Sequence, residues 1–152
     1  MLGSVLAPVK RVLSNTAVAR RLYDALAKRD GAALLSVLHP SFVGVVSAGM
    51  PLGVGGRHEG ADAMLAEVWA PVFSAYDVEP RPDELIPAGA DRVVAIGTYR
   101  GTERATGMPV NAAFVHVLRI DDGRVRELVQ VTDTASWPTC SAPEDKESRP
   151  TT

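Results

Sequence analysis

Two polar side chains with chemical potential, His116 and Gln130, lie in neighbouring runs of alternating apolar residues. The segment 109–133 reads PVNAAFVHVLRIDDGRVRELVQVTD, and its Asp-Asp-Gly sequence at 121–123 predicts the turn of a β-hairpin. Because side chains alternate between the two faces of a strand, His116 and Gln130 each fall on a face otherwise suited to burial. A histidine can act as a general acid or base near neutral pH, whereas a glutamine amide only donates and accepts hydrogen bonds. The pair therefore predicts a site on the inner face of this hairpin.

Each of these residues also has a structural interpretation. His116 can line a pocket and move protons, or it can be a core histidine satisfied by a neighbouring donor or carbonyl. Gln130 can orient a substrate carbonyl or hold a water against His116, or it can pair with a side chain on the partner strand. The sequence leaves both pairs of alternatives open.

Asp133 is the carboxylate nearest to the end of the hairpin. Its strand parity is opposite to that of Gln130, so it points to the other face unless a bulge intervenes. Followed by Thr-Ala-Ser-Trp at 134–137, it also suits the cap of a last helical turn, and this interpretation is favoured. If Asp133 reaches the pocket, it is the expected catalytic partner of His116.

Several aromatic and apolar residues are candidates for contact with a substrate. Tyr99 lies between Gly97 and Gly101 in an alternating run, so its ring is expected to have free space and its phenol could donate to a substrate oxygen or simply pack. The other candidates can equally belong to the core; they are Trp69, Phe73, Phe114, Leu128 and Met50.

The elements that must position these residues change type along the chain. Helical spacing of apolar residues predicts helices early, and period-2 alternation predicts strands late. This order predicts an α+β fold with a curved antiparallel sheet wrapped around the N-terminal helices. The expected helices are 16–38, interrupted at 28–31, and a stretch from 60 in which Pro71 should cause a kink or start a new turn. The expected strands are 41–47, 76–86, 92–104 and the hairpin, and 48–60 is expected to be a glycine-rich loop.

Composition limits the possible function classes. The chain has 152 residues, of which 46% are hydrophobic and 22% charged, as is usual for a single globular domain. A net charge of −2 gives no reason to expect nucleic acid or an anionic membrane as a partner. One cysteine, Cys140, and three widely separated histidines argue against a disulfide framework and against a metal site. With no apolar run of membrane-spanning length and no signal peptide, a cytoplasmic protein is expected.

Three segments carry a resemblance to a known superfamily: RRLYDALAKRDGAALLSVLHP near the N-terminus, GRHEGADAMLAEVW in the middle, and FVHVLRIDDGRVRELVQVTD in the hairpin. With them the chain resembles the nuclear transport factor 2-like superfamily, and within it the SnoaL-like polyketide cyclases, the ketosteroid isomerases and, through MPL at 50–52, the limonene-epoxide hydrolases. The resemblance implies a cone-shaped fold that encloses one apolar pocket. It divides the chain into an extension (1–15), the SnoaL-like domain (16–137) and a disordered tail (138–152).

The resemblance also assigns positions. His116 falls where the cyclases keep a pocket histidine and where ketosteroid isomerase has its oxyanion-binding acid. Gln130 stands where the cyclases place an acid–base aspartate and the epoxide hydrolases a carboxylate, and the isomerase's helix-1 tyrosine corresponds to Leu22. None of the three chemistries therefore transfers intact, as expected for a fold that hosts many functions.

The predicted function is that of a cofactor-free enzyme acting on a small, apolar, oxygenated molecule of polyketide or terpenoid type. The reaction would be isomerisation, cyclisation or epoxide opening, with His116 moving the proton. The alternative is a non-catalytic module that binds small molecules or another partner. A homodimer is expected through the outer face of the sheet, where alternation gathers Val115, Val117, Val129 and Val131.

Overall fold

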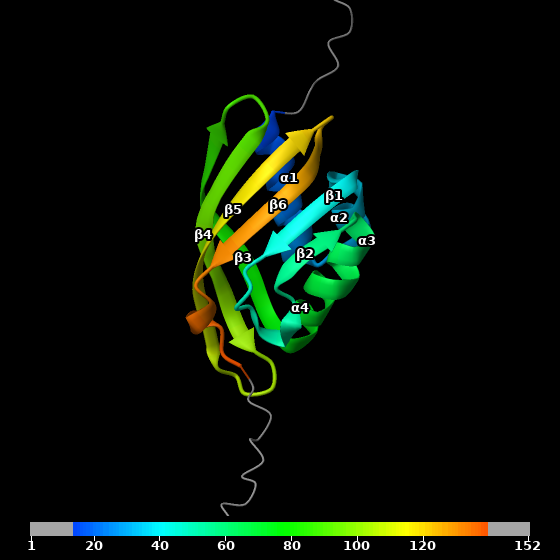
Figure 1. The fold of residues 1–152 in the computed structure, drawn as a ribbon. Helices are drawn as coiled ribbons and strands as arrows, with labels where there is room; N and C mark the ends of the chain where they lie inside the picture. The colour runs from blue at the N-terminus through cyan, green and yellow to red at the C-terminus, as the bar shows by residue number, and fades with distance from the viewer. Residues whose placement is uncertain (1–13, 140–152) are drawn as a thin grey trace, which may run out of the picture.

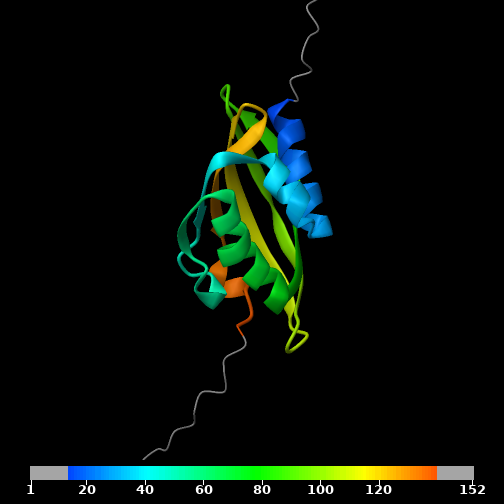
Figure 2. The ribbon, with the colours of Figure 1, turned by 90° about the vertical axis from the view of Figure 1, so that its right-hand side faces the viewer.

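A computed structural model describes residues 14–139, in which helices lie together on one side of a curved sheet (Figures 1 and 2). The predicted N-terminal extension (except its last two residues), Cys140 and the rest of the predicted tail beyond 139 lie outside the described residues. The helices are α1 (Asn15–Lys28), α2 (Gly31–Val37), α3 (Ala61–Met64) and α4 (Ala70–Ala75), and the strands are β1 (Leu38–Val46), β2 (Gly56–Glu59), β3 (Tyr76–Ala88), β4 (Arg92–Glu103), β5 (Pro109–Asp121) and β6 (Arg124–Thr132).

The six strands form one sheet in the order β2-β1-β6-β5-β4-β3. The α+β fold with a curved sheet is thus as predicted, with one difference in strand direction. β1 runs parallel to β6, while every other neighbouring pair in the sheet is antiparallel. A parallel pair needs a long connection, and here the chain from β2 through β5 supplies it before β6 returns alongside β1 (Figure 1).

Residues at and next to the helix ends determine where α1 and α2 begin and end. The Ser14 side chain caps α1 by accepting from the Ala17 N–H, so the cap precedes the Asn15 or Thr16 expected from sequence. Arg29 ends the helix in the left-handed conformation, and the Asp30 side chain then caps α2. This break lets the two helices cover different parts of the sheet.

The helical stretch after residue 60 contains a widened turn before Pro71. A π-helical turn, η2 (Leu65–Trp69), joins α3 to α4, and the Ala70 N–H donates to the Leu65 carbonyl five residues back. Proline cannot donate to the carbonyl four residues before it, so the irregularity at this place has a physical cause. Of the two outcomes predicted for Pro71, a kink or a new turn, the structure shows the second: Pro71 lies in the first turn of α4, two residues after the π turn ends.

The sheet curls where β3 and β4 approach each other closely. A Cβ atom added to Gly97 would lie 2.1 Å from the Arg81 carbonyl oxygen, and one added to Gly101 would lie 1.8 Å from that of Asp77. Only glycine fits such an approach, in line with the role expected for glycine in bent strands.

The expected glycine-rich loop 48–60 contains structure that its composition does not predict. Residues 56–59 form β2, which pairs with β1, and Pro51–Gly53 form a short 3₁₀ turn. A strand this short is stabilised by its partner rather than by its own sequence. No helix within residues 14–139 is both long and apolar enough to cross a membrane.

Candidate functional site

The β5–β6 hairpin places His116 and Gln130 directly opposite each other in register. Its turn forms at Asp122 and Gly123, both with positive φ, as the turn sequence predicts. The two side chains are 2% and 8% exposed, on the face of the sheet that carries Phe114 and other core residues. The hairpin thus places a polar pair on the inner face of the curved sheet.

Both ring nitrogens of His116 are hydrogen-bonded to tyrosine hydroxyls. Nδ1 lies 2.8 Å from the hydroxyl of Tyr23 on α1, and Nε2 lies 2.7 Å from the hydroxyl of Tyr99 on β4. The Phe114 ring stacks on the imidazole with centroids 4.1 Å apart. Two elements distant in sequence, α1 and β4, together with Phe114 on the same strand, therefore hold this ring in one orientation.

Gln130 extends the same chain of hydrogen bonds. Its Nε2 donates to the Tyr99 hydroxyl at 2.8 Å, and its Oε1 accepts from the Ser47 N–H at 3.3 Å. The Ser47 hydroxyl donates to the main-chain carbonyl of Gln130 and accepts from the N–H of Thr132. The orientation of the amide is set by Ser47, because only the oxygen end can accept from a backbone N–H.

Burial keeps every member of this chain uncharged. It lowers the pKa of His116 from 6.5 to about 3, so the imidazole is neutral at physiological pH. Burial also raises the pKa of Tyr99, an effect that the hydrogen bond from Gln130 partly opposes, and it raises the pKa of Tyr23, with the nearby Tyr99 as a smaller cause. Both phenols therefore keep their protons and can donate.

This network forms one wall of an inner cavity of about 30 Å³. Within residues 14–139, none of the side chains that line it carries a charge, and its main polar groups are Tyr99, His116 and Gln130. The volume admits a water or one terminal group of a ligand. The lining residues are Leu26, Met50, Met64, Val68, Trp69, Val72, Phe73, Val78, Pro80, Tyr99, His116, Leu128, Gln130 and Trp137.

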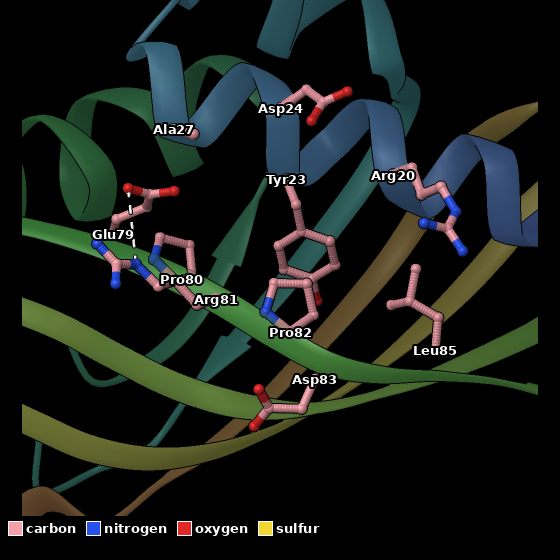
Figure 3. Close-up of a pocket in the computed structure, with 10 residues that line it drawn as sticks. All are labelled: Arg20, Tyr23, Asp24, Ala27, Glu79, Pro80, Arg81, Pro82, Asp83 and Leu85. Carbon is pink, nitrogen blue, oxygen red and sulfur yellow. Dashed lines mark ion pairs between the residues drawn. The ribbon is translucent and has the colours of Figure 1, made fainter.

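A larger cleft of about 450 Å³ lies on the other side of Tyr23, between α1 and β3. Figure 3 shows the Tyr23 ring pointing from the helix toward the sheet, with Pro82 in front of it and charged side chains around the rim. Two of those charged groups, Glu79 and Arg81, form an ion pair with 3.9 Å between Oε2 and Nε. Tyr23 thus lines the wide cleft, and its hydrogen bond to His116 connects it to the wall of the inner cavity.

The structure brings most of the predicted substrate-contact residues to the inner cavity. Met50, Trp69, Phe73, Tyr99 and Leu128 line it together with His116 and Gln130. Phe114 lies behind this wall, where its ring stacks against His116 and packs on Tyr99.

Asp133 occupies the position that the cap interpretation predicts. It is exposed, and its carboxylate accepts from the Ala135 N–H and the Ser136 hydroxyl, which starts the 3₁₀ turn η3 (Thr134–Ser136). It is not among the residues that line the inner cavity, so the structure does not bring this candidate catalytic carboxylate to His116.

Sequence reasoning missed two members of the network. Tyr23, rather than the neighbouring Leu22, is the α1 residue that reaches His116, and Leu22 is fully buried in the core. The signal was available in the helical spacing of Ala19, Tyr23 and Leu26, which places a tyrosine on the buried stripe of α1. Ser47 had no comparable signal, because its role depends on where β6 lies.

The two remaining histidines have other partners. His58 places Nδ1 2.7 Å from the Glu67 carboxylate and Nε2 2.7 Å from the Val54 carbonyl. Nδ1 of His39 accepts from the Ser41 N–H. Within residues 14–139, no group of three or more histidine, cysteine or acidic side chains is arranged to hold a metal ion.

Comparison with known families identifies the fold that carries this site. The family model described as the SnoaL-like domain matches residues 19–128, a segment that includes Tyr23, Tyr99 and His116. The chain belongs to the SnoaL-like domain family. The match ends at Leu128, before Gln130.

Solved structures agree with this assignment. The SnoaL-like chain is 33% identical to an NTF2-like protein of unknown function from Burkholderia pseudomallei K96243, with a TM-score of 0.72 over 80% of this chain and 92% of that one. It is 30% identical to TerC, co-crystallised with polyporic acid, with the same TM-score and coverage. A Catenulispora acidiphila protein with a ketosteroid isomerase-like fold, in complex with trimethylamine, shares 16% identity at a TM-score of 0.68 over 78% and 87% of the chains, which shows the fold alone. No curated protein matches the chain significantly.

Proposed function

We propose that this SnoaL-like protein is a cofactor-free enzyme that acts on a small, mostly apolar, oxygenated molecule of polyketide or terpenoid type. The reaction class is isomerisation, cyclisation or epoxide opening. One observation carries the proposal: in the buried series of hydrogen bonds Tyr23–His116–Tyr99–Gln130, the last three residues line an otherwise apolar cavity. A buried polar network is costly unless fully satisfied, and its position in the wall of an otherwise apolar cavity supports a role in binding a ligand.

His116 would move a proton without becoming charged. A neutral imidazole can accept a proton at one nitrogen while it releases one from the other, and here each nitrogen has a phenol as its partner. Because burial lowers the pKa of His116 to about 3, the ring is suited to such a relay more than to action as an independent base. Tyr99 and Gln130 would position and polarise the substrate oxygen.

The apolar wall would supply orientation. Once the lining moves to admit more than a terminal group, residues such as Trp69, Phe73 and Leu128 can hold a folded substrate with its reacting atoms together. Alignment of this kind can contribute roughly 7–11 kcal/mol to an intramolecular reaction. Since TerC is related to this chain and was co-crystallised with polyporic acid, that compound is the first to test here.

The test is turnover by the purified protein. Polyporic acid and a panel of polyketide and terpenoid ketones and epoxides are incubated with wild-type protein, and the products are identified by mass spectrometry. His116→Ala should lower turnover about 10²–10⁴-fold, the usual range for general acid–base groups, while ligand binding persists. His39→Ala is the matched control, because His39 lies outside the cavity and should leave turnover unchanged.

The outcome that contradicts the proposed role is equal turnover by wild type and His116→Ala. Circular dichroism of His116→Ala and His39→Ala shows whether a loss of turnover comes from loss of the fold.

A second function has its own support. The inner cavity has a volume of only about 30 Å³, and within residues 14–139 no carboxylate lines it. Both observations suit a non-catalytic module that binds small molecules. Binding of apolar oxygenated ligands to a protein that converts none of the panel would favour this alternative.

A further inference from the structure

In the buried series of hydrogen bonds Tyr23–His116–Tyr99–Gln130, the contact between Ser47 and Gln130 restricts where the hydrogen atoms can lie. The Ser47 N–H makes Oε1 of Gln130 the acceptor, so the Nε2 group of the same amide donates to the Tyr99 hydroxyl. A neutral imidazole carries one ring hydrogen, on either Nδ1 or Nε2. Only two arrangements of the remaining hydrogens therefore satisfy all the contacts.

In the first arrangement, the hydrogen of His116 is on Nε2 and is donated to Tyr99, while the Tyr23 hydroxyl donates to Nδ1. Tyr99 then accepts from both His116 and Gln130, and its own hydrogen is left for a third partner. Since Tyr99 lines the inner cavity, that partner is whatever occupies the cavity.

In the second arrangement, the hydrogen is on Nδ1 and is donated to Tyr23, while Tyr99 donates to Nε2. The Tyr23 hydrogen then needs an acceptor, and within residues 14–139 the hydroxyl contacts no hydrogen-bonding group of the protein other than His116. Only the first arrangement leaves the Tyr99 hydrogen free for a ligand oxygen in the cavity, and in both arrangements the second hydrogen on Nε2 of Gln130 is a further donor on the same wall.

We infer that the inner cavity binds its ligand through a hydrogen-bond-accepting oxygen, such as a ketone or quinone carbonyl, that takes the Tyr99 hydrogen. Tyr23 is a positioning residue in this arrangement: by donating to Nδ1 it holds His116 in the Nε2–H form. The inference rests on the proposed function only in treating this cavity as the ligand site. The ligand class is defined by the oxygen atom that enters the cavity and accepts from Tyr99.

The geometry of the cavity agrees with this assignment. About 30 Å³ accommodates a terminal oxygen beside Tyr99, whereas a larger body requires the lining to move. Met50 and Met64 line the cavity, and their unbranched side chains can adopt other rotamers at low cost. Two N–H donors on the Tyr99 oxygen also strengthen its own hydroxyl as a donor.

The test compares two ligands of the same shape. Cyclopentanone offers a carbonyl oxygen, and methylenecyclopentane has a CH₂ group in its place. With wild-type protein the ketone should bind about three- to tenfold more tightly, as one net hydrogen bond allows. Tyr99→Phe should abolish this preference, and Tyr23→Phe should reduce it. Tyr76→Phe removes a phenol that belongs neither to the series of hydrogen bonds nor to the cavity lining. It is therefore the matched control and should keep the preference.

A spectroscopic measurement distinguishes positioning from mere structural support. Long-range ¹H–¹⁵N NMR of the imidazole should place the His116 hydrogen on Nε2 in the ketone complex of wild type, and this state should be lost or mixed in Tyr23→Phe. The inference is overturned by equal affinity for the two ligands, by binding of neither, or by a hydrogen on Nδ1 in the ketone complex.

These results separate the inference from the proposed enzyme. Ketone preference with the Nε2–H form, but without turnover of any compound, supports the inference and counts against catalysis. Turnover without ketone preference overturns the inference and leaves catalysis standing.

Discussion

Two neighbouring cross-strand pairs of the β5–β6 hairpin, called rungs here, reverse the usual rule that polar residues are exposed and apolar residues are buried. The inward rung pairs His116 with Gln130, which are 2% and 8% exposed. The adjacent outward rung pairs Val115 with Val131, which are 36% and 58% exposed. A polar pair is thus buried beside an apolar pair that meets solvent.

The comparison shows that a buried polar pair and an exposed apolar pair each need contacts with other groups. The buried pair has found its partners inside the protein, since Tyr23, Tyr99 and Ser47 satisfy the hydrogen bonds of the rung. Within residues 14–139 nothing covers the exposed valines in the same way, and contiguous exposed apolar groups usually meet another molecule. The inner rung therefore supports a ligand site, and the outer rung supports the proposed homodimer.

The largest expected effect comes from a charge placed in the inner rung. In Gln130→Asp, an ionised carboxylate opposite His116 should favour the imidazolium and raise its pKa by about one to three units from the value near 3. Gln130→Asn is the matched control, because it has the same size without the charge. An NMR titration of the His116 ring measures the shift, and identical titrations in the two variants would show that position 130 does not face the imidazole.

A charge in the outer rung should act on assembly instead. Val131→Lys brings like charges together across a two-fold interface, so we expect the dissociation constant of the dimer to rise about tenfold or more. Ala32→Lys, an exposed site on α2 and on the helix side of the sheet, should leave it unchanged. Sedimentation analysis over a range of concentrations measures both, and a wild-type protein that is monomeric throughout would contradict the homodimer.

The buried imidazole should also make stability depend on pH. Between about pH 3 and 6.5 the unfolded chain binds a proton at His116 that the folded protein does not bind. The free energy of unfolding should therefore rise with pH across this window, by at most about 1.4 kcal/mol per pH unit from this group, and its contribution should be level above the window. Urea unfolding of wild type and His116→Gln at several pH values checks this, since the variant should show a shallower slope.

The smallest effect is expected just beyond the hairpin, at Asp133. Its carboxylate caps η3, so Asp133→Ala should lower the free energy of unfolding by about 0.5–2 kcal/mol. Asp133→Asn keeps an oxygen that can cap and should be nearly neutral. Neither variant should lower turnover; a large loss of activity in Asp133→Asn alone would return this residue to the catalytic machinery.

Short-range features could be predicted from the sequence because backbone geometry alone produces them. Period-2 alternation predicts that His116 falls on a buried face, and in the structure it lies there with Ala112, Phe114, Leu118 and Ile120 of β5. The turn at 121–123 and the Asp133 cap depend on residues within a few positions of each other, and both formed where the sequence predicts.

Contacts between distant segments could not be predicted in the same way. The sequence predicts a loop where β2 forms, because a strand of four residues is stabilised only by its pairing with β1. The parallel alignment of β1 with β6 follows from the path of the whole chain.

The amino-acid sequence by itself determined the α+β class, the hairpin, and the presence of a histidine and a glutamine on its inner face. Only the tertiary structure decided what those two side chains meet. Tyr23 and His116 are 93 positions apart, and their hydroxyl and ring nitrogen come within 2.8 Å only because α1 packs across the sheet. Local periodicity decides the face to which a side chain points, whereas its hydrogen-bond partners and the protonation state that they support depend on the packing of the complete fold.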